Sequence, residues 1–118
     1  MEDYQLTLRK LAVRDEHYID ALLQTDRANA TLAGIEERAH ALIRIGALIT
    51  LNAAPAAYME AVAKAFRAGA SHEEIVGTLI TLLRTVGVAR VVTAAPNLGL
   101  ALGYDVAEAL ELVENGGG

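Results

Sequence analysis

Hydrophobic residues recur along this chain at intervals of three and four, which is the spacing of one face of an α-helix. After Pro55, for example, Tyr58 and Val62 fall on one face, whereas Glu60 and Lys64 fall on the other. No run alternates apolar and polar residues in the manner of a strand. The pattern therefore predicts an all-α fold of six or seven helices. The expected helices cover residues 3–12, 16–29, 35–51, 55 to the turn at 69, 72–85, 88–102 and a last segment capped by Asp105.

The stretch AFRAGASHEEI, residues 65–75, marks the end of one helix and the start of the next. Gly69 stands where a helix needs a left-handed residue in order to stop, a conformation that glycine adopts without steric cost. Ser71 offers an N-cap oxygen, and Glu74 stands three residues later, which completes a capping box. Because the turn is short, we expect the two helices to lie side by side and roughly antiparallel.

The helix expected at 72–85 is apolar almost all round, which indicates burial on several sides. Gly87 should end or kink it, and Pro96 should kink the helix that follows. The chain has 118 residues, of which 53% are hydrophobic, and its mean hydropathy is +0.31. Because so short a chain cannot cover this helix on every side, we predict a homo-oligomer. We also predict a single domain over residues 1–115 and a disordered tail at 116–118.

Charge and composition narrow the function classes. The net charge is −5 and the basic residues are scattered, which argues against a nucleic-acid partner. The absence of cysteine excludes disulfides, thiol catalysis and thiolate metal sites. No spacing of histidines and carboxylates predicts a metal site, and we expect no cofactor. Arg44, Arg84 and Arg90 interrupt the apolar runs and no signal peptide opens the sequence, so we expect a cytoplasmic protein without membrane contact.

One segment carries the motifs of a known family. Glu37-Arg38 opens an apolar helix, residues 65–75 supply the turn described above, and the next helix bears Leu79, Leu82, Leu83 and Gly87. In this order the segment from about 36 to 103 resembles the carboxymuconolactone decarboxylase family, which includes the AhpD-like alkylhydroperoxidases. The resemblance implies an AhpD-like helical bundle, a lyase-like activity on a small carboxylate or lactone, and a hexamer built as a trimer of dimers.

The chain departs from this family at the positions that carry its chemistry. AhpD-like members have a Cys-x-x-Cys followed four residues later by histidine, and these positions fall near Ala54, Ala57 and Ala61. Because thiol peroxidase chemistry needs a thiolate, we do not expect a thiol peroxidase. Counting forward from Arg38 instead places Glu60 at the histidine position, which makes Glu60 a candidate replacement for the proton-transfer residue.

Three arginines lie inside apolar stretches and are candidate substrate-binding residues: Arg44, Arg84 and Arg90. A buried guanidinium must be paired, because an isolated buried charge is too costly. One interpretation is a pocket that binds a carboxylate through bidentate contacts. The other is ion pairing within or between subunits, with Glu60, Glu73 or Glu74 as partners.

His40 is the second candidate for proton transfer. It stands four residues after Glu36 and four before Arg44, so the three share one helix face. A carboxylate could orient His40 as a general base near neutral pH, but an exposed surface pair fits the same spacing. Glu60 likewise pairs with Lys64 at i,i+4, which is an ordinary arrangement on a helix surface.

Two functions remain open on the sequence. In the first, a cofactor-free enzyme binds a small acid through Arg44 or Arg90 and moves a proton with His40 or Glu60. In the second, the chain is a non-catalytic homo-oligomer that serves as a binding or scaffold protein. The missing cysteines and histidine favour the second, whereas the arginines in apolar runs favour the first.

Overall fold

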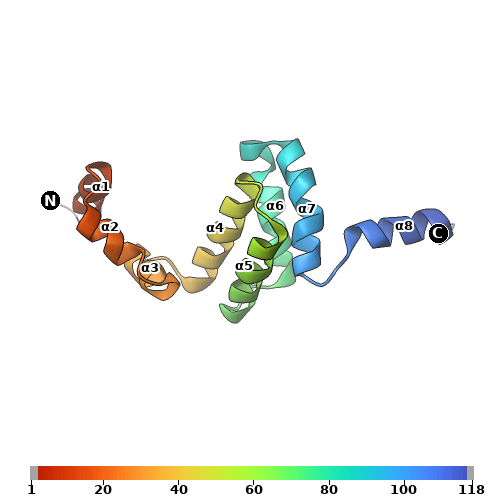
Figure 1. Ribbon diagram of the computed structural model, residues 1–118, viewed down its shortest axis with the longest axis horizontal. Helices are drawn as coiled ribbons and strands as arrows, with labels where there is room; N and C mark the ends of the chain where they lie inside the picture. The colour runs from red at the N-terminus through yellow and green to blue at the C-terminus, as the bar shows by residue number, and fades with distance from the viewer. Residues whose placement is uncertain (1–2, 117–118) are drawn as a thin grey trace. The chain divides into compact units, whose positions relative to one another are not determined.

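The structure, a computed structural model, describes residues 3–116, and these residues form eight helices and no strand. The all-α prediction is confirmed. Within the same residues, no helix has the length and apolarity that crossing a membrane requires. The helices are α1 (Asp3–Ala12), α2 (Glu16–Leu22), α3 (Asp26–Ala33), α4 (Glu37–Thr50), α5 (Pro55–Arg67), α6 (His72–Val86), α7 (Val88–Ala101) and α8 (Val106–Gly116) (Figure 1).

The count of eight corrects the prediction of six or seven, because the helix expected at 16–29 is two helices. α2 ends at Leu22, and Thr25 adopts an extended conformation with φ −147° and ψ 161°. The Thr25 hydroxyl accepts a hydrogen bond of 2.9 Å from the Ala28 amide and so caps α3. A threonine in an otherwise helical pattern is a weak break signal, yet it is a good N-cap.

The chain divides into two compact units, one ending at Glu36 and the other beginning at Glu37. The two units are described separately, and the single domain expected for residues 1–115 stays a prediction. The predicted disordered tail at 116–118 falls mostly outside the described residues, since 117–118 are not described and Gly116 is the last residue of α8. The helices α1–α3 belong to the first unit and α4–α8 to the second.

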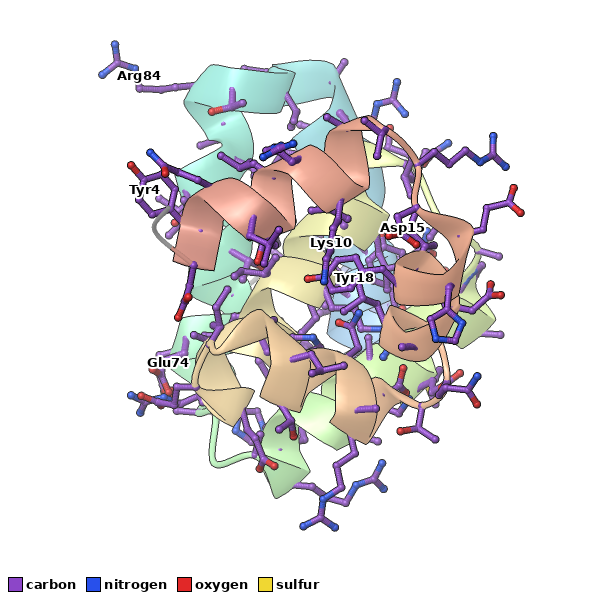
Figure 2. All side chains as sticks on the ribbon, turned by 90° about the vertical axis from the view of Figure 1, so that its left-hand side faces the viewer. Tyr4, Lys10, Asp15, Tyr18, Glu74 and Arg84 are labelled. Atoms are coloured by element: carbon purple, nitrogen blue, oxygen red, sulfur yellow. The ribbon has the colours of Figure 1, made fainter. Side chains whose placement is uncertain are left out.

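The first unit is held together by local contacts. The Asp15 carboxylate accepts a hydrogen bond of 3.1 Å from the Tyr18 amide and caps α2. The Lys10 ammonium lies 4.9 Å from the centre of the Tyr18 ring, a cation–π contact between α1 and α2 that Figure 2 shows. Among residues 3–36 none is buried, which is expected of so small a unit.

The second unit is built on a four-helix bundle. α4 packs against α5 and α6, and α7 packs against the same two helices (Figure 1). Each helix contributes apolar residues at helical spacing to one core. The buried apolar residues are Ala41, Ile45, Ile49, Tyr58, Ala61, Val62, Ala65, Ala70, Ile75, Val91, Ala94 and Leu98.

The expectation that the two helices flanking Gly69 lie side by side is wrong. Gly69 has φ +91° and ends the helix as predicted. However, α5 and α6 are not among the closely packed pairs of described helices, although residues 68–71 join them. The linker crosses the end of the bundle, so α6 lies diagonally opposite α5. Loop length does not fix helix pairing here, because α5 buries its apolar face against α4 and α7.

Two contacts show that α4 and α6 run parallel. Near the start of both helices, the Arg38 guanidinium lies 3.6 Å from the Glu74 carboxylate. Two turns further along both helices, Leu82 Cδ1 lies 3.6 Å from the position that a Cβ would occupy at Gly46. In both contacts the partners are 36 residues apart in the sequence. A constant offset means that residue numbers increase in the same direction along both helices, so the helices are parallel.

Candidate functional site

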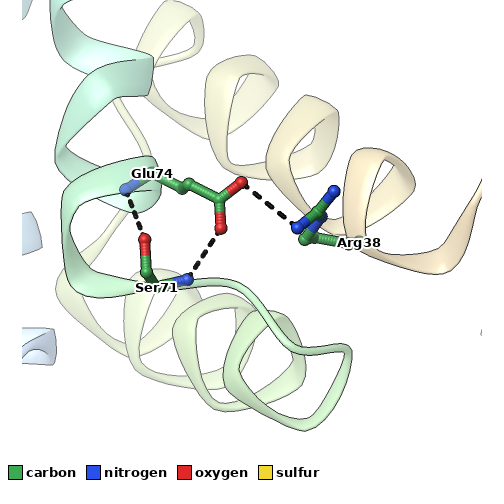
Figure 3. Close-up of polar contacts among 3 residues, drawn as sticks. All are labelled: Arg38, Ser71 and Glu74. Atoms are coloured by element: carbon green, nitrogen blue, oxygen red, sulfur yellow. Dashed lines mark hydrogen bonds and ion pairs between the residues drawn. The ribbon is translucent and has the colours of Figure 1, made fainter.

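The predicted capping box starts α6 and also ties it to α4. The Ser71 hydroxyl accepts a hydrogen bond of 3.0 Å from the Glu74 amide, and the Glu74 carboxylate accepts one of 3.0 Å from the Ser71 amide (Figure 3). The second carboxylate oxygen of Glu74 pairs with Arg38 of α4. One glutamate therefore satisfies a helix terminus and fixes the register of two parallel helices.

An open groove of about 610 Å³ runs between α4 and α6 next to this ion pair. Its walls consist of small and apolar residues, with Glu74 at one end. Small side chains leave the backbones of both helices close to the groove surface. The lining residues are Leu42, Ile43, Gly46, Ala47, Thr50, Glu74, Gly77, Thr78, Thr81 and Leu82.

The hydroxyl donors that line this groove are already engaged with the helix backbone. Thr50 donates to the Gly46 carbonyl at 2.9 Å, and Thr81 donates to the Gly77 carbonyl at 2.9 Å. Thr78 also donates to a carbonyl of its own helix. The hydroxyl protons of all three threonines are therefore used within α4 and α6. The groove is therefore suited to binding an apolar surface rather than to acid–base chemistry.

The three candidate arginines stand on three different helices. Arg44 on α4 is half-buried, whereas Arg84 on α6 and Arg90 on α7 are exposed in this chain. Figure 2 shows Arg84 extending away from the ribbon. None of the three is among the described residues that line the groove between α4 and α6. An arginine with apolar neighbours in the sequence is therefore not necessarily buried, because its side chain can lie on the outward face of the helix.

His40 and Glu60 are not among the described residues that line the groove either. His40 is half-buried one turn before Arg44 on α4, and both residues make interactions within the chain. Glu60 is exposed on α5, and its carboxylate lies 2.9 Å from the Lys64 ammonium. The i,i+4 pair expected on the surface of α5 is present.

Two residues that organise this region, Arg38 and Tyr58, were not predicted as site residues. The sequence placed Arg38 at a helix start and Tyr58 on an apolar helix face, and the burial of Tyr58 agrees with that placement. The side chain of Tyr58 is fully buried, and its hydroxyl donates a hydrogen bond of 3.2 Å to the Leu48 carbonyl near the end of α4. Burial raises the pKa of the Tyr58 phenol above its ordinary value. The sequence could have indicated this hydrogen bond, because a tyrosine on the apolar face of a helix needs a partner for its buried hydroxyl.

Other chemistry-bearing arrangements in the described residues are few. No group of three or more His, Asp or Glu side chains within residues 3–116 could hold a metal ion. The first unit has its own hollow of about 650 Å³, lined largely by apolar residues of α1, α2 and α3. This hollow brings together Tyr4 and Tyr18, and neither of them was predicted as a site residue.

The bundle leaves a row of large apolar side chains uncovered. On α6, Val76, Ile80 and Leu83 follow each other at one-turn spacing on one side of the helix, and Ile80 is 68% exposed. The prediction that α6 is buried on several sides is not met by this chain alone, since Ile75 is the α6 residue that it buries. A surface of this kind is typical of a contact with another protein.

Comparisons of the chain with models of known protein families, with curated protein sequences and with solved structures find no match.

Proposed function

We propose that this chain is a non-catalytic homo-oligomer that serves as a binding or scaffold protein. The uncovered apolar row on α6, Val76, Ile80 and Leu83, carries the proposal. Exposing these side chains to water is unfavourable by about 25 cal/mol for each Å² of apolar surface, and covering them by a second subunit recovers that free energy. The engaged hydroxyls of the groove support a binding role over a catalytic one.

The resemblance to the carboxymuconolactone decarboxylase family belongs to this proposal. A bundle of the AhpD-like kind that assembles as a hexamer, a trimer of dimers, would cover the sides of α6 that one chain leaves open. Alanines near 54, 57 and 61 replace the cysteines and the histidine of the family. In this proposal the chain is a relative that assembles in the same way but lacks thiol and histidine chemistry. A cytoplasmic location remains a prediction.

The concentration dependence of thermal unfolding tests the proposal. If folding is coupled to assembly, the melting temperature must rise with protein concentration by mass action. The Ile80→Glu variant should lose this dependence, whereas Ile80→Leu, which keeps an apolar side chain at the same position, should retain it. A melting temperature of the wild type that is constant over a hundredfold dilution would contradict the proposal.

A second candidate function rests on Arg44. It is the half-buried member of the three candidate arginines, and His40 lies one turn away on the same helix. An enzyme that handles a small carboxylate or lactone could bind the acid there, with His40 or Glu60 as the proton-transfer group. A bound acid at one hundred times its dissociation constant would stabilise the fold by about 2.7 kcal/mol.

A thermal-shift screen of small mono- and dicarboxylates decides between the two functions. The enzyme predicts stabilisation of the wild type that Arg44→Met abolishes, while the exposed Arg90→Met serves as the control. The scaffold predicts no stabilisation by any acid. A shift that survives Arg44→Met would rule out Arg44 as the carboxylate-binding residue.

A further inference from the structure

The last helix, α8, carries an apolar stripe that the chain leaves largely uncovered. Val106, Ala109, Leu110 and Val113 recur at the i, i+3, i+4, i+7 spacing of one helix face. Val106 and Ala109 are half-buried, but Leu110 is 61% exposed and Val113 is 57% exposed. Such a stripe is what an amphipathic helix uses to bind a hydrophobic groove.

The turn before α8 holds the start of this helix against α7. A Cβ at Gly99 would lie 2.9 Å from the Tyr104 carbonyl oxygen and 2.9 Å from Val106 Cγ2, so the two segments pack closely. The Tyr104 amide donates a hydrogen bond of 2.8 Å to the Gly99 carbonyl. α8 packs against α7, and none of the described residues of α7 or α8 lines the groove between α4 and α6.

The groove between α4 and α6 has the shape features that a helix requires. Gly46 and Gly77 lie in its walls, and a Cβ added at Gly77 would meet no atom within 4 Å. Glycines on a helix surface let a second backbone approach closely. The same chain therefore contains an uncovered apolar helix face and an unfilled apolar groove.

Charge favours the same pairing. Residues 37–103 contain six Lys and Arg against four Asp and Glu, a net charge of +2, whereas residues 104–118 contain four acidic residues and no basic one, a net charge of −4. The charged residue in the groove lining, Glu74, is already paired with Arg38. Arg84 does not line the groove, but it follows the lining residues Gly77 and Thr81 at helical spacing on α6 and is exposed. Glu114 stands one turn after Leu110 and flanks the apolar stripe of α8.

We propose that α8 of one copy docks into the α4–α6 groove of a second copy, with Leu110 and Val113 in the groove and Glu114 facing Arg84. The inference rests on the homo-oligomer proposed above and names the contact that builds it. It also gives Arg84, predicted as a substrate-binding residue, a role in assembly.

A matched pair of variants tests the α8 side of the contact. Leu110 and Leu112 are 61% and 65% exposed and lie on different sides of α8. In sedimentation velocity, Leu110→Glu should weaken association at least tenfold, whereas Leu112→Glu should behave as the wild type. Equal behaviour of the two variants would overturn the inference but leave the proposed homo-oligomer standing, while a wild type that sediments as a monomer would overturn both.

Engineered cysteines test the partner, because the chain has no native cysteine. On mild oxidation, a mixture of Ala47→Cys and Leu110→Cys chains should form a disulfide-linked pair of one chain of each kind. A mixture of Ala47→Cys with Leu112→Cys, as the control, should not. A chain with both substitutions that closes an internal disulfide as a monomer would show that α8 fills its own groove, and the absence of any link would show that the groove is not the receptor; either result overturns the inference.

Discussion

At the scale of single residues, Tyr58 links the two helices that begin the bundle. Its ring is fully buried in the core, and its hydroxyl donates to the Leu48 carbonyl. That carbonyl also accepts the Ala53 amide at 3.0 Å, so it keeps one partner if the tyrosine hydroxyl is removed. We therefore expect Tyr58→Phe to fold and to cost only about 0.5–1.5 kcal/mol of the free energy of unfolding.

The raised pKa of Tyr58 predicts a dependence of stability on pH. In the unfolded chain the phenol ionises near its ordinary pKa of about 10, whereas in the folded protein burial holds it neutral to higher pH. The stabilisation is complete below pH 10 and is lost as the pH rises through the folded pKa. Urea unfolding from pH 8 to 11 should show the wild-type advantage over Tyr58→Phe shrinking above pH 10; parallel curves would contradict this account.

The capping box gives a second prediction at this scale. Ser71→Ala removes the acceptor for the Glu74 amide at the start of α6 and should cost about 0.5–2 kcal/mol. Ser71→Asp keeps an N-cap acceptor and serves as the control. Chemical denaturation measures both, and equal midpoints for the two variants would mean that the cap does not stabilise α6.

Residue-level features were predictable where they depend on near neighbours in the sequence. The Ser71–Glu74 box and the positive φ of Gly69 follow from local chemistry, and both are present. The exposure of Arg84 was not predictable in the same way, since it depends on which side of α6 faces α4. Apolar neighbours in the sequence do not report which helix face a residue occupies.

At the scale of elements, helix bounds were easier to predict than helix partners. Pro55 and Gly87 mark real helix boundaries. The diagonal placement of α5 and α6 could not be derived from the short turn, because the packing of α4 between them depends on complementary faces distant in the sequence. The helix boundary at Thr25 was missed although its cap is a local interaction, because neither Gly nor Pro marks this position in the sequence.

Two glycines inside helices should respond oppositely to the same substitution. Gly77 in α6 has open space around a new Cβ within its own chain, so in the dissociated chain Gly77→Ala should raise the free energy of unfolding by about 0.5–1 kcal/mol through helix propensity. At Gly99 in α7 the new Cβ would lie 2.9 Å from a backbone carbonyl oxygen, which cannot easily move. Gly99→Ala should therefore destabilise the protein in spite of its better propensity. Chemical denaturation of both variants at one protein concentration tests this, and a shift of the same sign would contradict it.

At the scale of the whole molecule, the pattern along α6 and α8 predicts more contact surface than one chain covers. Ile80 and Leu110 are both more than half exposed, although each belongs to a helix face of apolar residues. The sequence indicated an oligomer from the apolar helix at 72–85 alone. It could not reveal the apolar stripe of α8 as uncovered, and it could not locate the groove between α4 and α6, which exists only once these helices are parallel neighbours.

The molar mass of the wild-type protein in solution tests this account most directly. The chain has a mass of 12.5 kDa. Light scattering coupled to size-exclusion chromatography at micromolar concentration should give at least twice that mass, and a hexamer is the assembly that the family resemblance implies. A mass of 12.5 kDa under these conditions would contradict the proposal that the uncovered helix faces bind other copies of the chain.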